Sequence, residues 1–263
     1  MPPSIRFTAQ EFEILWSAEG RDRLPYPLQF RTDIPDFDDL KRARESAVTS
    51  LLGKYDPILE RAMEVLLAPD ARIEAKGFGG AVHGDEQFTQ IYRFHGAVRD
   101  AMGVVMVQLP GPSADSGGDV IVKYCPAAQI GEYAVEALPR RRAGKQPPLE
   151  IRRNDMEADR ANPIRRGPTL ADQLDSIFQR PRQAYGEVMI FPGPALDARR
   201  APARCFWWMD YEDGRYYVKT TDPIVAKPID PKSLAAEVNR LTTLTAGYYR
   251  EDRIHDDYLR AHR

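Results

Sequence analysis

The spacing of apolar residues changes from a helical to a strand period along this chain, and this feature restricts its fold more than any other. Residues 8–67 place apolar side chains three or four positions apart, which is typical of amphipathic helices. Residues 72–124 then alternate apolar and polar side chains, as half-buried strands do. Residues 169–244 repeat the order of helix, strands and a helix that begins at a proline. The pattern predicts an α+β fold of two similar halves that share one antiparallel sheet. The two halves share too little sequence to establish a repeat, so their pseudo-symmetry stays open at this point.

Capping signals mark where several helices begin. Thr8 and Glu11 have capping-box spacing and predict a helix over residues 8–20. Further helices are predicted from Asp36, from Asp56-Pro57 and from Asp230-Pro231, and others near residues 126–138 and 170–178. Strands are predicted at residues 28–31, 72–76, 88–94, 102–109, 119–124, 185–191, 204–211 and 215–219.

The domain organisation follows from where these elements stop. We expect one domain over residues 1–263, with halves at about 1–138 and 169–244. Residues 139–168 contain three Arg-Arg clusters, Pro147-Pro148 and few apolar residues, and this composition predicts an irregular basic linker outside the sheet. Residues 245–263 are charged and lack a clear apolar face, so they are either a weak helix or a disordered tail.

The charge balance argues against nucleic acid and membranes as partners. Lys and Arg total 37 and Asp and Glu total 39, a net charge of -2, so no global field would gather either one. The arginine clusters are interspersed with acidic residues and lack interleaved aromatic residues. The most apolar stretch, residues 103–109, is too short to span a bilayer. The first ten residues contain no apolar run of the signal-peptide type, so we expect a cytoplasmic protein.

The sequence carries no motif of a catalytic, metal or cofactor site. Cys125 and Cys205 lack the spacing of a zinc site or a disulfide framework, and we expect two reduced thiols. His83 and Asp85, with Glu86, form the only local group of His and carboxylates, within the glycine-rich segment 77–87. A solvated loop is the favoured interpretation of this group. The alternative is a small-molecule-binding or enzymatic α+β domain centred on His83 and Asp85.

Aromatic residues concentrate in one hairpin, at residues 205–211 and at Tyr216-Tyr217. In a strand, Trp207 and Trp208 must point to opposite faces of the sheet. The hairpin therefore either buries aromatic side chains on both faces or offers one face to a partner.

Two segments resemble the EspG family of chaperones associated with type VII (ESX) secretion in actinobacteria. The first is Phe7-Thr-Ala-Gln-Glu-Phe-Glu-Ile-Leu-Trp16, followed by Leu24-Pro-Tyr-Pro-Leu28. The second is Asp213-Gly-Arg-Tyr-Tyr-Val218, which leads through Asp222-Pro223 to Asp230-Pro231 and Leu234. The order of elements between them also fits, so the resemblance spans nearly the whole chain.

The resemblance implies a central antiparallel sheet shared by two pseudo-symmetric halves and flanked by helical bundles. It also implies a cytosolic, non-enzymatic chaperone. Such a protein would bind a PE–PPE-like heterodimer, cover its apolar helical tip and keep it soluble. The binding surface of the family corresponds approximately to three parts of this chain, in which we predict protein-binding residues. They are Gly79, Gly80 and His83 in the loop, Trp208 and Tyr217 in the hairpin, and Val238 and Leu241 in the last predicted helix. We expect some of Trp208, Tyr217, Val238 and Leu241 to be partly exposed.

Overall fold

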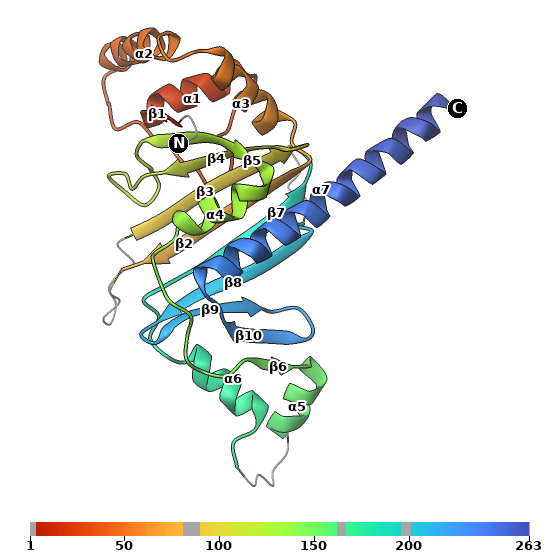
Figure 1. Ribbon diagram of the computed structural model, residues 1–263. Coiled ribbons are helices and arrows are strands. Elements are labelled where there is room, and N and C mark those ends of the chain that lie inside the picture. Colours follow the sequence, from red (N-terminus) through yellow and green to blue (C-terminus); the bar gives the residue numbers. More distant parts are fainter. Residues whose placement is uncertain (1–3, 81–89, 162–166, 196–200, 263) are drawn as a thin grey trace.

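One ten-stranded sheet forms the centre of the molecule (Figure 1). The structure is a computed structural model that describes residues 4–80, 90–161, 167–195 and 201–262. All neighbouring strands of the sheet are antiparallel, in the order β1-β5-β4-β3-β2-β7-β8-β9-β10-β6. The strands are β1 (Ser4–Phe7), β2 (Ala71–Gly79), β3 (Gln90–Arg99), β4 (Met102–Gln108), β5 (Val120–Pro126), β6 (Leu149–Ile151), β7 (Ala184–Pro192), β8 (Arg204–Tyr211), β9 (Gly214–Lys219) and β10 (Ile224–Pro228). The predicted antiparallel sheet built from both halves is confirmed.

The helices pack on both faces of this sheet. They are α1 (Ala9–Ala18), α2 (Phe37–Leu52), α3 (Pro57–Leu67), α4 (Ile130–Glu136), α5 (Arg153–Ala161), α6 (Leu170–Phe178) and α7 (Pro231–Ala261), with a short 3-10 turn at Ala127–Gln129 before α4. Figure 1 shows α4 and α7 lying across the middle strands, with α1–α3 at one end of the sheet and α5–α6 at the other.

The helices begin where their capping residues predict. The Thr8 hydroxyl accepts a hydrogen bond from the Glu11 backbone N–H, and the Glu11 carboxylate accepts one from the Thr8 N–H. The Asp36 carboxylate caps α2 by accepting from the backbone N–H groups of Asp38 and Asp39, and Asp56 and Asp230 cap α3 and α7, each followed by proline. These side chains satisfy backbone donors that the first helical turn leaves without partners.

The alternation of side chains divides the apolar interior between the two faces. On one face, α4 and α7 pack on the middle strands, with Ile73, Val188 and Trp208 among the buried residues. On the other face, α1 and α3 cover β1, β4 and β5 at one end, and α6 covers β8–β10 at the other. We call these the α4/α7 face and the open face, because the open face has helices only at its two ends.

Residues 139–168 differ from the prediction of an irregular linker outside the sheet. Leu149–Ile151 form the edge strand β6, which pairs with β10, and Arg153–Ala161 form α5. Leu149 and Ile151 are buried beside α6, and these two apolar positions in a polar segment are enough to anchor it. The prediction was wrong because a three-residue strand carries almost no periodic signal.

Three other segments also differ from their sequence-based interpretation. Residues 28–31 do not form a strand, and β1 at Ser4–Phe7 and β10 at Ile224–Pro228 were not predicted. The supposed tail continues α7 as a helix up to Ala261. Its helical form, one of the two alternatives, is the one observed.

Candidate protein-binding surface

Trp208 is completely buried, which contradicts the expectation that it is partly exposed. Trp208 is the cross-strand partner of Gly186 on β7, and Gly186 is in turn the cross-strand partner of Gly77 on β2. A Cβ atom at Gly77 would lie 2.4 Å from Trp208 Cζ2, and one at Gly186 would lie 2.7 Å from Trp208 Nε1. The indole therefore occupies the space that two absent side chains leave on the α4/α7 face.

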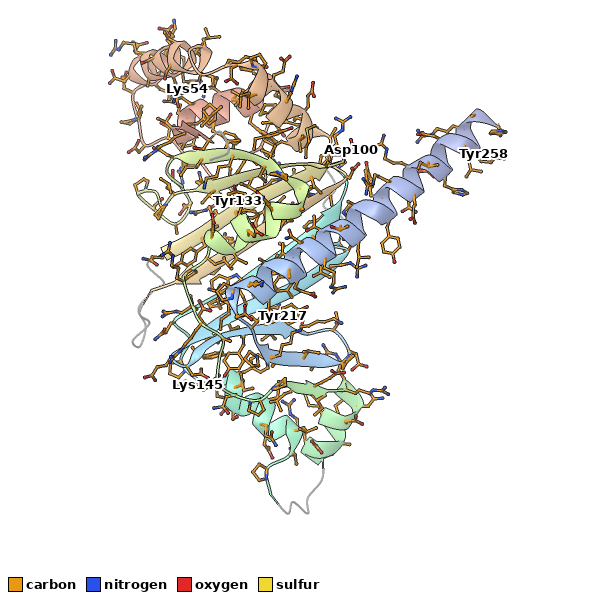
Figure 2. All side chains as sticks on the ribbon, in the orientation of Figure 1. Lys54, Asp100, Tyr133, Lys145, Tyr217 and Tyr258 are labelled. Carbon is orange, nitrogen blue, oxygen red and sulfur yellow. The ribbon has the colours of Figure 1, made fainter. Side chains whose placement is uncertain are left out.

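Tyr217, Val238 and Leu241 are also buried, with exposed fractions of 6%, 1% and 7%. Tyr217 stacks on Phe206 with ring centroids 4.8 Å apart, and burial raises the pKa of its hydroxyl to about 12. Figure 2 shows Tyr217 beside α7, which carries Val238 and Leu241. The expectation of exposure was wrong because the last helix and the aromatic hairpin cover each other.

The neighbouring residue Trp207 points to the open face, as the alternation in a strand requires. It is half-buried, and so are Tyr185 on β7 and Phe78 on β2. Phe78 and Tyr185 are direct cross-strand partners with ring centroids 5.7 Å apart. We call Phe78, Tyr185 and Trp207 the aromatic strip. Tyr185 and Trp207 lie at the edge of the apolar cluster under α6.

Charged side chains border the aromatic strip. Glu187 pairs with Lys76 on one side and Trp207 on the other, and the Arg182 guanidinium lies 5.4 Å from the Tyr185 ring. Burial lowers the pKa of the Lys76 ammonium, and the charge of Arg93 lowers it further. A half-buried aromatic centre with a charged rim is the composition of a protein-binding surface rather than of a catalytic site.

A layer of buried polar side chains separates the aromatic strip from the N-terminal helices. Arg72 forms an ion pair with Glu74 at 2.9 Å, and the Arg93 guanidinium donates to the carbonyl of Ala114 at 2.5 Å. His95 Nδ1 lies 2.8 Å from the carbonyl oxygen of Tyr26, and burial lowers the pKa of this imidazole. These contacts fasten the segment around Tyr26 to the sheet, which is a structural role.

The predicted loop residues lie near one end of the aromatic strip or outside the described part of the chain. Gly79 is the last residue of β2, where a Cβ atom would lie 2.9 Å from the Tyr92 ring. Gly80 follows with a φ of 113°, a conformation that glycine adopts readily. His83 and Asp85 lie outside the described residues.

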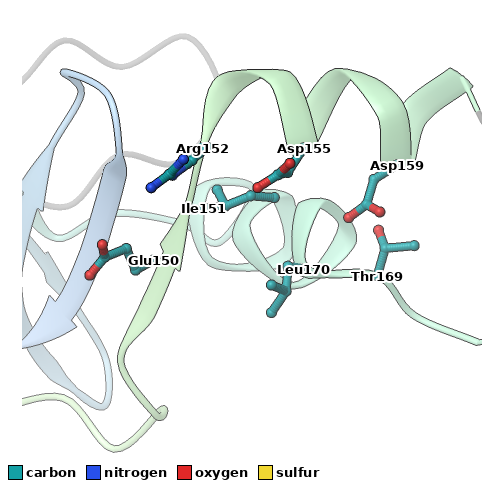
Figure 3. A pocket seen from close by; sticks show the side chains of 7 residues that line it. All are labelled: Glu150, Ile151, Arg152, Asp155, Asp159, Thr169 and Leu170. Carbon is teal, nitrogen blue, oxygen red and sulfur yellow. The ribbon is translucent and has the colours of Figure 1, made fainter.

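The pocket between β6, α5 and α6 was not singled out from the sequence. It has a volume of about 620 Å³, and Figure 3 shows Asp155 and Asp159 on one side of α5 with Thr169 beside Asp159. The Asp159 carboxylate accepts a hydrogen bond from the backbone of Ala171. Within the described residues, no group of three or more His, Cys, Asp and Glu side chains could hold a metal ion. The Asp159 carboxylate connects α5 to α6.

Both cysteines are free thiols, as expected. Burial raises the pKa of Cys125 to about 11 and that of Cys205 to about 12, the latter with help from its hydrogen bond to Glu187. Such thiols are protonated and unreactive at neutral pH. Over the described residues, no helix combines the length and the apolar character needed to cross a membrane.

Comparisons with known proteins agree with the fold. A search of curated proteins finds no match. Among solved structures, the chain is similar to the Mycobacterium tuberculosis type VII secretion system chaperone EspG5, solved in complex with a PE25–PPE41 dimer. The two share 17% sequence identity, with a TM-score of 0.59, over 93% of this chain and 96% of the other. The model of the EspG family matches residues 8–240. That match covers most of the chain, so this protein belongs to the EspG family of type VII secretion chaperones, which are not enzymes.

Proposed function

We propose that this protein is a cytosolic chaperone for a PE–PPE-like heterodimer, and that it covers an apolar helical tip of that substrate until secretion. Membership of the EspG family supports the chaperone role, and the PE25–PPE41 dimer bound to EspG5 supports this class of substrate. An exposed apolar helix end tends to self-associate in water. A complementary apolar surface on a soluble partner prevents this.

The aromatic strip is the observation that carries the location of the binding surface. Phe78, Tyr185 and Trp207 come from three neighbouring strands and lie on the open face between the two groups of helices. Half-buried rings present apolar area while their packing keeps them rigid, so little conformational entropy is lost on binding. Gly79 and Gly80 lead from this surface into the loop that the sequence singled out.

The proposal reassigns the role of four residues from the sequence-based prediction. Trp208, Tyr217, Val238 and Leu241 are buried on the α4/α7 face, so we infer that they support the sheet under the surface instead of contacting the substrate. Trp207, the direct neighbour of Trp208, takes the contact role. His83 stays a candidate contact at the loop.

The strand order supports a related proposal, that the two halves are pseudo-symmetric parts of one domain. From the outer edge of the sheet to its centre, the strands of the first half follow the order β1-β5-β4-β3-β2. The strands of the second half, also from the edge to the centre, follow the order β6-β10-β9-β8-β7, which is the same order with each number raised by five. Each half also ends in a helix on the α4/α7 face. In this arrangement, the aromatic strip crosses the junction between β2 and β7, so neither half holds it alone.

A charge placed in the aromatic strip tests the binding surface. The Trp207→Glu variant should weaken binding of a PE–PPE pair that the wild-type protein binds by about 2 kcal/mol or more, because the carboxylate would be buried without a partner. The matched control is Leu52→Glu on α2, where the exposed fraction is 71% and binding should stay unchanged. Calorimetry measures both, after thermal unfolding confirms that each variant is folded. Equal affinities of wild type and a folded Trp207→Glu variant would place the surface elsewhere.

A further inference from the structure

A second pocket lies on the α4/α7 face, opposite to the aromatic strip. It has a volume of about 780 Å³, within the range of sites for small molecules. The end of α4, the segment after it, the start of β9 and the start of α7 form its walls. Its lining includes Glu136, Pro139, Arg140, Arg141, Arg142 and Arg215.

Arg215 lies at the inner wall of this pocket, where its side chain is completely buried and its guanidinium carbon is 5.0 Å from the centroid of the Trp208 ring. Its Nε and Nη2 atoms bind the Asp210 carboxylate at 2.7 and 2.8 Å, and Nη2 also donates to the Pro139 carbonyl at 2.7 Å. Nη1 has no hydrogen-bond partner among the described residues. Because Nη1 is also closed to solvent, Arg215 holds the Pro139 end of the arginine segment in place, and the donors that a ligand can reach are those of the exposed Arg140, Arg141 and Arg142.

The three neighbouring arginines belong to a segment that is fixed to the sheet. The Arg142 carbonyl accepts from the Arg215 N–H at 2.8 Å, and the Gly144 N–H donates to the Arg215 carbonyl at 3.0 Å. Gly144 lies against the Tyr216 ring, where a Cβ atom would come within 2.2 Å of the ring carbons. The backbone that carries Arg140, Arg141 and Arg142 is therefore held beside Arg215.

The charges around the pocket are mainly positive. Among the described residues that line it, Glu136 is the only acidic one, and Asp210 is already paired with Arg215. None of Arg140, Arg141 and Arg142 forms an ion pair with another residue of the described ranges. Asp230 caps α7 through Ser233, so the arginines supply the positive charge and the helix end does not. Such a concentration of guanidinium groups attracts and binds oxyanions.

We propose that this pocket binds a small oxyanion, a phosphate or a carboxylate, with the exposed Arg140, Arg141 and Arg142 as its donors and with Arg215 holding their segment in place. The site is on the face opposite to the aromatic strip and does not depend on the chaperone role. An anion bound there would also tie the end of α4 to β9.

Titration of the full chain with sodium pyrophosphate and, separately, with sodium citrate tests this proposal. Isothermal calorimetry at constant ionic strength should show one site for at least one of the two anions, and the preferred anion distinguishes phosphate from carboxylate chemistry. The double variant Arg141→Gln/Arg142→Gln should weaken the Kd at least tenfold. The matched control Arg31→Gln/Arg61→Gln removes the same charge from exposed positions away from the pocket and should keep the wild-type Kd.

A spectroscopic readout tests the role of Arg215 without a substitution. The Nε–H resonance of Arg215 should shift on saturation with the anion, because the anion binds to the arginine segment whose Pro139 carbonyl this guanidinium holds. Absence of binding by both anions overturns the proposal. Equal Kd values in the two double variants, or an unchanged Arg215 resonance at saturation, would do the same.

Discussion

At the residue scale, glycine decides where the largest buried side chain of the sheet can lie. Trp208 fits on the α4/α7 face because Gly77 and Gly186 leave its indole room. The sequence shows that Trp207 and Trp208 point to opposite faces, but it does not show which face the helices cover. That choice depends on contacts between residues far apart in the sequence, such as Trp208 on β8 and Gly77 on β2. The wrong expectation for Trp208 has this origin.

A methyl group at Gly77 should therefore destabilise the protein. We expect Gly77→Ala to lower the free energy of unfolding by about 1–3 kcal/mol, because its Cβ would overlap Trp208 Cζ2 and approach the Tyr185 carbonyl oxygen. The control is Gly247→Ala on α7, where no atom lies within 4 Å of the added Cβ. That change should stabilise the protein by up to about 1 kcal/mol. Urea denaturation measures both, and equal effects of the two substitutions would contradict the packing described for Trp208.

His95 gives the stability a defined dependence on pH. Burial lowers its pKa below 6.5, and Glu74 and the hydrogen bond to Tyr26 only partly oppose this. Below about pH 6.5, the His95 side chain therefore binds a proton in the unfolded chain but stays neutral in the folded protein until a lower pH. The free energy of unfolding should thus fall as the pH drops below about 6.5, by at most about 1.4 kcal/mol per pH unit. The His95→Gln variant should show a smaller slope between pH 7 and pH 5 in denaturant titrations. Parallel slopes would rule out His95 as the cause.

At the scale of elements, sequence signals predicted the long helices and middle strands, and missed the edges of the sheet. Capping residues marked α1, α2, α3 and α7 because these signals act within one turn of the chain. The missed strands β1, β6 and β10 have four, three and five residues. The partners of β1 and β6 lie far away in the sequence, and β10 follows its partner β9 directly but has too few residues to show a period. Periodicity also failed to predict the full length of α7, because the second half of this helix has no buried face and therefore no apolar pattern.

The distal third of α7, residues 251–261, should contribute little to stability. Beyond Arg250, each described residue of α7 is exposed, and Figure 2 shows Tyr258 on the part that projects from the sheet. Deleting residues 251–263 should change the free energy of unfolding by less than about 1 kcal/mol. Deleting residues 236–263 also removes Val238 and Leu241 from the core and should unfold the protein, because one such loss costs about 2–5 kcal/mol. A large loss of stability from the shorter deletion would show that the distal helix packs on the protein in solution.

At the scale of the whole molecule, the β2–β7 pairing joins the two halves. All nine residues of β2 pair with β7, and β3 flanks β2 on its other side. The core on the α4/α7 face likewise takes Ile73 and Phe94 from the first half and Val188, Trp208 and Val238 from the second. Both the sheet and this core therefore cross the junction, and the aromatic strip crosses it too.

Neither half should fold alone. A fragment of residues 1–138 would expose the β2 edge and lose the α7 cover of its core, and an open apolar edge of this length pairs with other chains. We expect this fragment to aggregate when it is expressed alone. Co-expression with residues 139–263 should give a soluble 1:1 complex, because the β2–β7 pairing and the shared core can form between two chains. The reassembled complex should also regain binding of the PE–PPE pair, since it restores the junction between Phe78 and Tyr185. Size-exclusion chromatography and thermal unfolding measure these outcomes. A monodisperse fragment 1–138 with its own cooperative transition would mean that the chain contains two independent domains.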